Sequence, residues 1–158
     1  MSKTRYIHYG SREFQSELFD PPRNRCNMTK PDGGLWASPV DAQYGWRNWC
    51  EANQFRECNE DDSFTFELTE NANVIHIYKL SDLDDLPQCK DERLSFLSDW
   101  FVPDFEWLVK RGCDAIELHL SEEDRTGCGF LEGLYWSLYG WDCDSILILN
   151  PDIVVEVE

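Results

Sequence analysis

The stretch KPDGGLWASPVDAQYGWRNWCEANQF, residues 30–55, says most about the expected fold. Its PDGG turn leads into a short apolar run, which predicts a strand over Leu35–Ser38. Ser38 and Pro39 then suit the cap and the first turn of a helix, which is predicted over Val40–Asn53. Aromatic rings gather in this stretch: Trp36, Tyr44, Trp46 and Trp49. Such rings either fill a core or form a wall for a planar ligand, and both uses stay open.

Short apolar runs recur on both sides of this stretch and predict further strands. They lie at Arg5–Tyr9, Ser63–Leu68, Asn73–Leu80, Ala115–Leu120, Ser145–Asn150 and Ile153–Val157. A helix is predicted over Asp91–Arg111, kinked or split at Pro103, and a short one over Phe130–Tyr139, closed by Gly140. Because hairpins mix with helices without strict alternation, the sequence predicts an α+β fold. A chain of 158 residues suits one domain, residues 1–158.

The charge of the chain is strongly negative and unevenly spread. Acidic residues outnumber basic ones by 31 to 14, which gives a formal net charge of −17. Residues 1–30 carry six Lys or Arg against three acids, whereas the remaining residues carry 8 against 28. This balance argues against nonspecific binding to nucleic acid, which depends on Lys and Arg contacts to phosphates. The acidic surface either favours solubility or binds a basic partner.

The seven cysteines form no C-x-x-C pair and no zinc-binding spacing. An odd number of cysteines and the polar start MSKTRYIHYG favour free thiols and a cytoplasmic protein without a membrane span. His76 and His119 fall within predicted strands and are interpreted as ordinary strand residues rather than ligands. No metal is therefore expected.

The run RYIHYGS, residues 5–11, contains the most unusual histidine. Alternation along a strand places Tyr6 and His8 on one face and Ile7 and Tyr9 on the other. The strand is expected to end at Gly10, where the lack of a Cβ lets the backbone approach a ligand closely. A histidine at a strand end is by itself a weak functional signal.

Together, the histidine strand and the Gly-Leu-Trp-Ala-Ser segment resemble the ADP-ribosyltransferase superfamily, in its branch typified by diphtheria toxin and poly(ADP-ribose) polymerases. The resemblance implies two small facing, mostly antiparallel sheets with flanking helices, and NAD held between them as substrate. It implies that His8 grips the nicotinamide ribose and that Trp36 stacks on nicotinamide. The other implied NAD contacts are Tyr9, Gly10, Gly34, Leu35 and Ser38. Tyr9 stands where the family has a glycine after the histidine.

The same resemblance implies an acidic residue at the start of a late strand, which steadies the positive charge that develops as nicotinamide leaves. Asp144 is the positional match, although the family usually has Glu there. Asp142 is the reserve, and Glu132 is a further candidate. The basic N-terminal residues either lie in a solvated loop or hold the pyrophosphate of NAD; they are Arg12, Arg23, Arg25 and Lys30.

The resulting hypothesis is an NAD-dependent mono-ADP-ribosyltransferase, with Asp144 and His8 as catalytic residues and a protein or nucleic acid as acceptor. A toxin or antitoxin component shares this chemistry and differs in its biological setting. The alternative is a noncatalytic acidic protein that binds and inhibits a basic partner, as a mimic of nucleic acid does.

Overall fold

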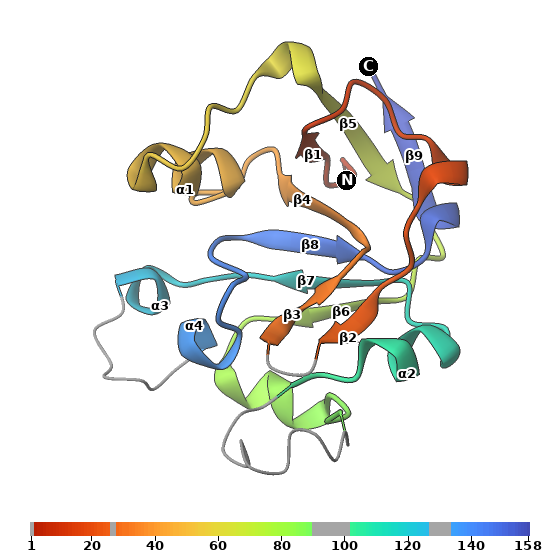
Figure 1. Cartoon of the computed structure of the whole chain (residues 1–158), viewed down its shortest axis with the longest axis vertical. Coiled ribbons are helices and arrows are strands. Elements are labelled where there is room, and N and C mark those ends of the chain that lie inside the picture. Colours follow the sequence, from red (N-terminus) through yellow and green to blue (C-terminus); the bar gives the residue numbers. More distant parts are fainter. Residues whose placement is uncertain (1, 26–27, 90–101, 127–133) are drawn as a thin grey trace.

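The computed structural model describes residues 2–25, 28–89, 102–126 and 134–158. The described strands are β1 (Tyr6–Tyr9), β2 (Arg23–Arg25), β3 (Met28–Asp32), β4 (Leu35–Pro39), β5 (Ser63–Leu68), β6 (Val74–Ile77), β7 (Ala115–Leu118), β8 (Ser145–Ile148) and β9 (Val154–Val157). The described α-helices are α1 (Trp46–Asn53), α2 (Phe105–Lys110), α3 (Glu122–Thr126) and α4 (Leu134–Ser137). The predicted α+β class is confirmed (Figure 1).

Seven strands form one mixed sheet in the order β6-β7-β8-β4-β1-β5-β9, and β2 and β3 form a separate pair. Among these described strands β6 and β7 pair in parallel, and the remaining pairs are antiparallel. Strand β4 joins the two halves of the sheet. Its residues Leu35–Ala37 pair with β8, whereas Ser38 and Pro39 pair with β1. The sheet strands are thus connected through one strand whose partner changes along its length.

The sheet folds over at β4, so that its two halves pack against each other. In a flat sheet β1 and β7 would stand about 14 Å apart, three strand spacings. Yet the Tyr6 hydroxyl on β1 donates a hydrogen bond to Glu117 on β7, at 3.0 Å. One core cluster also combines Phe66 of β5 with Ile146 and Ile148 of β8. Figure 1 shows β1, β5 and β9 grouped above β4, β8, β7 and β6.

The second core cluster lies on the other face of β7 and β8. Ile116, Leu118 and Leu147 project into it, in alternation with residues of the first cluster, as the two-residue period of a strand requires. Phe105 and Leu108 of α2 and residues of α4 cover this face. None of the described helices is long and apolar enough to span a lipid bilayer.

The predicted helix over Val40–Asn53 is wrong in its first turns, because α1 begins at Trp46. Pro39 still belongs to β4, where it pairs with Tyr6. Ser38 nevertheless caps the helix from a distance, since its Oγ accepts a hydrogen bond from the Trp46 amide at 2.9 Å. Gly45 fits this junction because a Cβ there would lie only 3.0 Å from the Ser38 Cβ.

The other helix predictions hold in part. Of the predicted helix Asp91–Arg111, residues 90–101 lie outside the described ranges, and the described helix α2 starts after Pro103, which forms a bridge with Gln88. Helix α4 lies within the predicted Phe130–Tyr139, and Gly140 follows it with φ +96°. The β2–β3 pair and helix α3 were not predicted, because their sequences carry no apolar periodicity.

Candidate functional site

A cavity of about 170 Å³ opens where β1 and β4 diverge, and we call it the indole cavity. Its walls come from β1, β4, α1 and the segment before β8. Its lining comprises Ile7, His8, Tyr9, Lys30, Trp36, Ala37, Ser38, Trp46, Arg56, Trp141, Cys143 and Ser145. None of these described lining residues is acidic.

His8 marks the point where the two strands separate. Its ring Nδ1 lies 2.6 Å from the carbonyl oxygen of Trp36. This side-chain contact links β1 to β4 beyond the last backbone pairing between them, at Ile7 and Ser38. Burial lowers the pKa of His8, and the nearby Arg56 guanidinium acts in the same direction. The ring is therefore neutral at pH 7, and Nδ1 must carry the proton because a carbonyl only accepts. Nε2 is left as an acceptor that faces the space beside Gly10.

Gly10 gives that space its shape. Its φ of +122° is a backbone conformation that side-chain-bearing residues rarely adopt. A Cβ built there would lie 3.8 Å from His8 Nε2 and 3.6 Å from Arg56 Nη2. The sequence expectation that Gly10 lets backbone approach a ligand is consistent with this position.

The indole rings surround a cation. The Lys30 ammonium lies 4.7 Å from the ring centroid of Trp36 and 5.9 Å from that of Trp46. Trp141 meets Trp36 edge to face, at 4.8 Å between centroids and 80° between planes. Trp46 stacks in turn on Trp49 at 5.1 Å. The cavity thus presents electron-rich ring faces at a position that a positive charge already occupies.

The structure brings some of the predicted site residues together and separates others. His8, Tyr9, Trp36 and Ser38 line the indole cavity, with Gly10 beside them. Gly34 and Leu35 line a different cavity on the far side of β4. Gly34 is needed for packing, because a Cβ there would lie 2.4 Å from Leu147 Cδ1.

Of the four predicted pyrophosphate contacts, Lys30 alone lines the indole cavity. Arg23 is paired with Asp20, and Arg25 with Asp32. Arg12 lines the same separate cavity as Gly34. Arg56 is the second cation at the indole cavity, and its sequence context gave no signal for that role.

Asp144 faces away from the indole cavity. Its carboxylate accepts hydrogen bonds from the Leu120 amide at 2.7 Å and the Tyr44 amide at 3.4 Å. Its backbone carbonyl accepts a hydrogen bond from Ser38 Oγ at 2.8 Å. These contacts hold β8 against the segments before α1 and after β7. These hydrogen bonds give Asp144 a structural role that is independent of any catalytic role.

The other two acid candidates differ in what the structure describes. Asp142 is half-buried between Trp141 and Cys143, both of which line the indole cavity, and its φ is +65°. Burial raises the pKa of Asp142, whereas the Lys30 ammonium lowers it, so the two side chains interact electrostatically. Glu132 lies outside the described residues.

A second cavity, of about 360 Å³, lies on the other side of the Ser38–Asp144 contact. Asp144 lines it together with Tyr6, His76, Glu117 and His119. The last three are the only described residues whose His, Cys, Asp or Glu ligand atoms cluster closely enough to hold a metal ion. We call this second space the His–Glu cavity.

No protein-family model, curated protein or solved structure matches this chain.

Proposed function

We propose that the indole cavity binds the nicotinamide end of NAD, and that the protein is an ADP-ribosyltransferase that uses NAD as donor. The position of the Lys30 ammonium between Trp36 and Trp46 supports this most directly. The nicotinamide ring of NAD is flat and positively charged, so the faces of indole rings attract it as they attract the Lys30 ammonium. Lys30 has a long, flexible side chain that can leave this position to a ligand.

The arrangement of strands also supports the proposal. The resemblance assigns the histidine, the aromatic residue and the acid to three strands, which here are β1, β4 and β8. These strands are neighbours in the sheet, with β4 in the middle. The change of partner along β4 and the packing of the two sheet halves fit the facing-sheet core that the resemblance implies.

His8 is proposed to hold the ribose. Its neutral ring keeps Nδ1–H on the Trp36 carbonyl, which fixes the orientation of the ring. Nε2 is then an acceptor for a ribose hydroxyl that enters beside Gly10. A cavity of about 170 Å³ suits a ring and part of a sugar rather than a whole dinucleotide. The pyrophosphate would therefore lie at the opening, within reach of Arg56 and the displaced Lys30.

Transfer of ADP-ribose requires a carboxylate near the ribose. The bond between ribose C1′ and nicotinamide N1 breaks, and its electron pair leaves with neutral nicotinamide. The acceptor forms a new bond to C1′ and loses a proton. A carboxylate stabilises the positive charge that develops on the sugar. Asp144 faces the other cavity. Asp142 does not line the indole cavity either, but it stands between the lining residues Trp141 and Cys143 and interacts electrostatically with Lys30, so we assign this role to Asp142, the reserve candidate.

The binding step is tested by the melting temperature with and without NAD. A ligand at about 100 times its Kd stabilises the folded state by about 2.7 kcal/mol. We expect NAD to raise the melting temperature of the wild type and of Trp107→Leu, whose ring is exposed on α2. NAD should not stabilise Trp36→Leu, measured against that variant's own baseline. No shift in the wild type would contradict the proposal.

The transfer step is tested by the release of free nicotinamide in the presence of a cell lysate. We expect Asp142→Asn to abolish release while NAD still raises the melting temperature. Asp144→Asn, compared at a temperature where it is folded, should retain release. Loss in Asp144→Asn alone would return the catalytic role to Asp144. NAD binding without any release would leave a nucleotide-binding protein without transferase activity.

A second candidate function rests on the acidic surface. The turn before β5 carries the exposed carboxylates Glu57, Glu60, Asp61 and Asp62 within a chain of net charge −17. Such a surface suits a basic partner, with binding that weakens steeply as salt concentration rises. Salt-sensitive capture of a purified basic protein such as a histone, with no effect of NAD on stability, would favour this function.

A further inference from the structure

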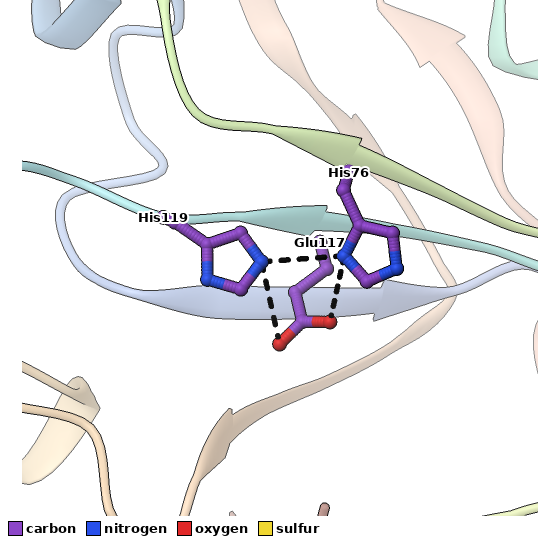
Figure 2. Close-up of side chains that lie close together, drawn as sticks. All are labelled: His76, Glu117 and His119. Carbon is purple, nitrogen blue, oxygen red and sulfur yellow. Dashed lines mark hydrogen bonds and ion pairs between the residues drawn. The ribbon is translucent and has the colours of Figure 1, made fainter.

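His76, Glu117 and His119 converge on one point in the His–Glu cavity (Figure 2). His76 Nδ1 lies 3.2 Å from Glu117 Oε2, and His119 Nε2 lies 3.7 Å from Glu117 Oε1. The two ring nitrogens lie 3.3 Å from each other. Figure 2 shows both imidazoles turned toward the same carboxylate.

The strand register explains why these side chains meet. His76 on β6 is paired directly with Glu117 on the parallel strand β7. His119 follows two residues after Glu117 and so projects from the same face. Three side chains from two neighbouring strands therefore share one surface of the sheet, and Tyr78 stacks on His119 at 4.2 Å with planes 6° apart. The stacked ring limits the rotation of the His119 imidazole.

The carboxylate of Glu117 is buried, and its basic neighbours among the described residues are the imidazoles of His76 and His119. Only 4% of its side chain is exposed. Tyr6 donates one hydrogen bond to it, and within the described residues no Lys or Arg forms an ion pair with it. Burial raises the pKa of Tyr6, and the charge of Glu117 raises it further, so the phenol stays a neutral donor. A buried carboxylate is costly unless a positive charge compensates it.

The ligand spacing matches a metal ion. Zinc bonds of 2.0–2.2 Å to nitrogen and oxygen in a tetrahedron place neighbouring ligand atoms about 3.4 Å apart. The three separations of 3.2, 3.3 and 3.7 Å lie close to this value. We propose that His76, Glu117 and His119 bind a divalent transition metal ion of the zinc class. Two histidines with one carboxylate are a common set for metals that keep an open coordination position.

The open position faces the cavity. Two further carboxylates line it: Asp144, which accepts hydrogen bonds from the amides of Leu120 and Tyr44, and the exposed Asp41. A water molecule or a small substrate is available to complete the coordination. The side chains of His76 and His119 are 44% and 31% exposed, which gives a cation access from solvent. This site does not depend on the NAD proposal, because no residue of the trio lines the indole cavity.

The same three residues also admit an arrangement without metal, in which the imidazoles hydrogen-bond to Glu117 and to each other. Metal titration separates the two. We expect the full chain, freed of metal by a chelator and dialysed, to bind Zn²⁺ at one ion per chain by calorimetry. Cobalt(II), as a spectroscopic probe, should give the visible absorption of a four- or five-coordinate site without a sulfur charge-transfer band.

Variants assign the site to the trio. Glu117→Gln keeps the shape of the side chain, His76→Ala removes an exposed ring, and His119→Ala removes a half-buried one, so each should fold. We expect each to weaken Zn²⁺ binding at least 100-fold. His8→Ala removes a histidine outside the cavity and should bind Zn²⁺ as the wild type does. Cys58→Ser controls for a thiol site, since Cys58 lies beside Cys50.

Three results would overturn the proposal. The first is the absence of Zn²⁺ and Co²⁺ binding to the wild type at concentrations up to about 1 mM, the weak limit of a specific site. The second is full Zn²⁺ binding by folded Glu117→Gln and His76→Ala, and the third is the loss of Zn²⁺ binding in Cys58→Ser. Each would leave the hydrogen-bonded arrangement as the role of the trio.

Discussion

The indole cavity and the His–Glu cavity lie on opposite sides of the Ser38–Asp144 contact, and they differ in the charge of their buried titratable groups. In the indole cavity burial lowers the pKa of His8 and raises the pKa of the Cys143 thiol to about 12, so both groups are neutral. The His–Glu cavity instead keeps a buried carboxylate beside two imidazoles. The first suits a ligand that brings its own charge and a flat ring. The second suits a bare cation.

The two cavities also differ in how the chain assembles them. The indole cavity forms where neighbouring antiparallel strands diverge, and half of its lining residues lie in two short segments, 7–9 and 36–38. The His–Glu cavity depends on the parallel register of β6 and β7, segments about 40 positions apart. Substitutions that affect one cavity, both, or neither therefore test the comparison.

The largest expected effect comes from Gly34→Ala, which should damage both cavities. The new Cβ would lie 2.4 Å from Leu147 Cδ1, and the φ of +71° disfavours a side chain. We expect a loss of about 2–4 kcal/mol in the free energy of unfolding, measured by urea denaturation. Gly112→Ala is the matched control, because its φ is +78° but nothing lies within 4 Å. It should cost about 1 kcal/mol, and equal costs would refute steric packing as the cause.

The next effect concerns the Cys143 thiol of the indole cavity at alkaline pH. The pKa of Cys143 is raised from 9.0 to about 12, so the folded state keeps its proton where the unfolded state loses it. The resulting stability is complete below pH 9 and is lost as pH rises toward 12. The loss per thiol reaches about 1.4 kcal/mol per pH unit. Cys143→Ala should flatten the denaturation profile between pH 9 and 11, whereas Cys58→Ala, at a less buried thiol, should change it less.

A smaller effect is expected at the partner of the buried carboxylate. Tyr6→Phe removes the hydrogen bond to Glu117 but keeps the ring stacked on Phe66. We expect Zn²⁺ affinity to fall about 10-fold, because groups that hold a metal ligand in place typically have effects of this size. Calorimetric titration measures it. Tyr78→Phe, which keeps the ring over His119, should leave the affinity unchanged, and an equal fall in both would contradict the assigned role of Tyr6.

Short apolar runs predicted the seven strands of the main sheet, and two of these strands, β7 and β8, are buried on both faces. The start of α1 was predicted wrongly because Ser38 and Pro39 indicate a helix that begins directly after them in the sequence. Ser38 caps Trp46 across an intervening turn, while Pro39 completes a strand. The grouping of His8, Trp36 and Ser38 was anticipated by the resemblance. The side to which Asp144 points was not, since it depends on contacts with Tyr44 and Leu120.

His76 and His119 were interpreted as ordinary strand residues, since nothing in one sequence fixes the register between two strands. The motif Glu-x-His at 117–119 does indicate two side chains on one strand face. The third member, His76, comes from a parallel neighbour, and its alignment with Glu117 exists only in the folded chain. A close pair on a strand is thus the available signal, and the completing residue must come from the structure.

The contact between Ser38 and Asp144 makes the two cavities share a wall. Ser38 lines the indole cavity, its Oγ donates to the Asp144 carbonyl, and Asp144 lines the His–Glu cavity. The two proposed sites are thus linked through one contact, and thermodynamic reciprocity applies to them. For the two ligands proposed above, any factor by which zinc changes the affinity for NAD must equal the factor by which NAD changes the affinity for zinc. Titrations of the two proposed ligands in either order must therefore give the same coupling free energy.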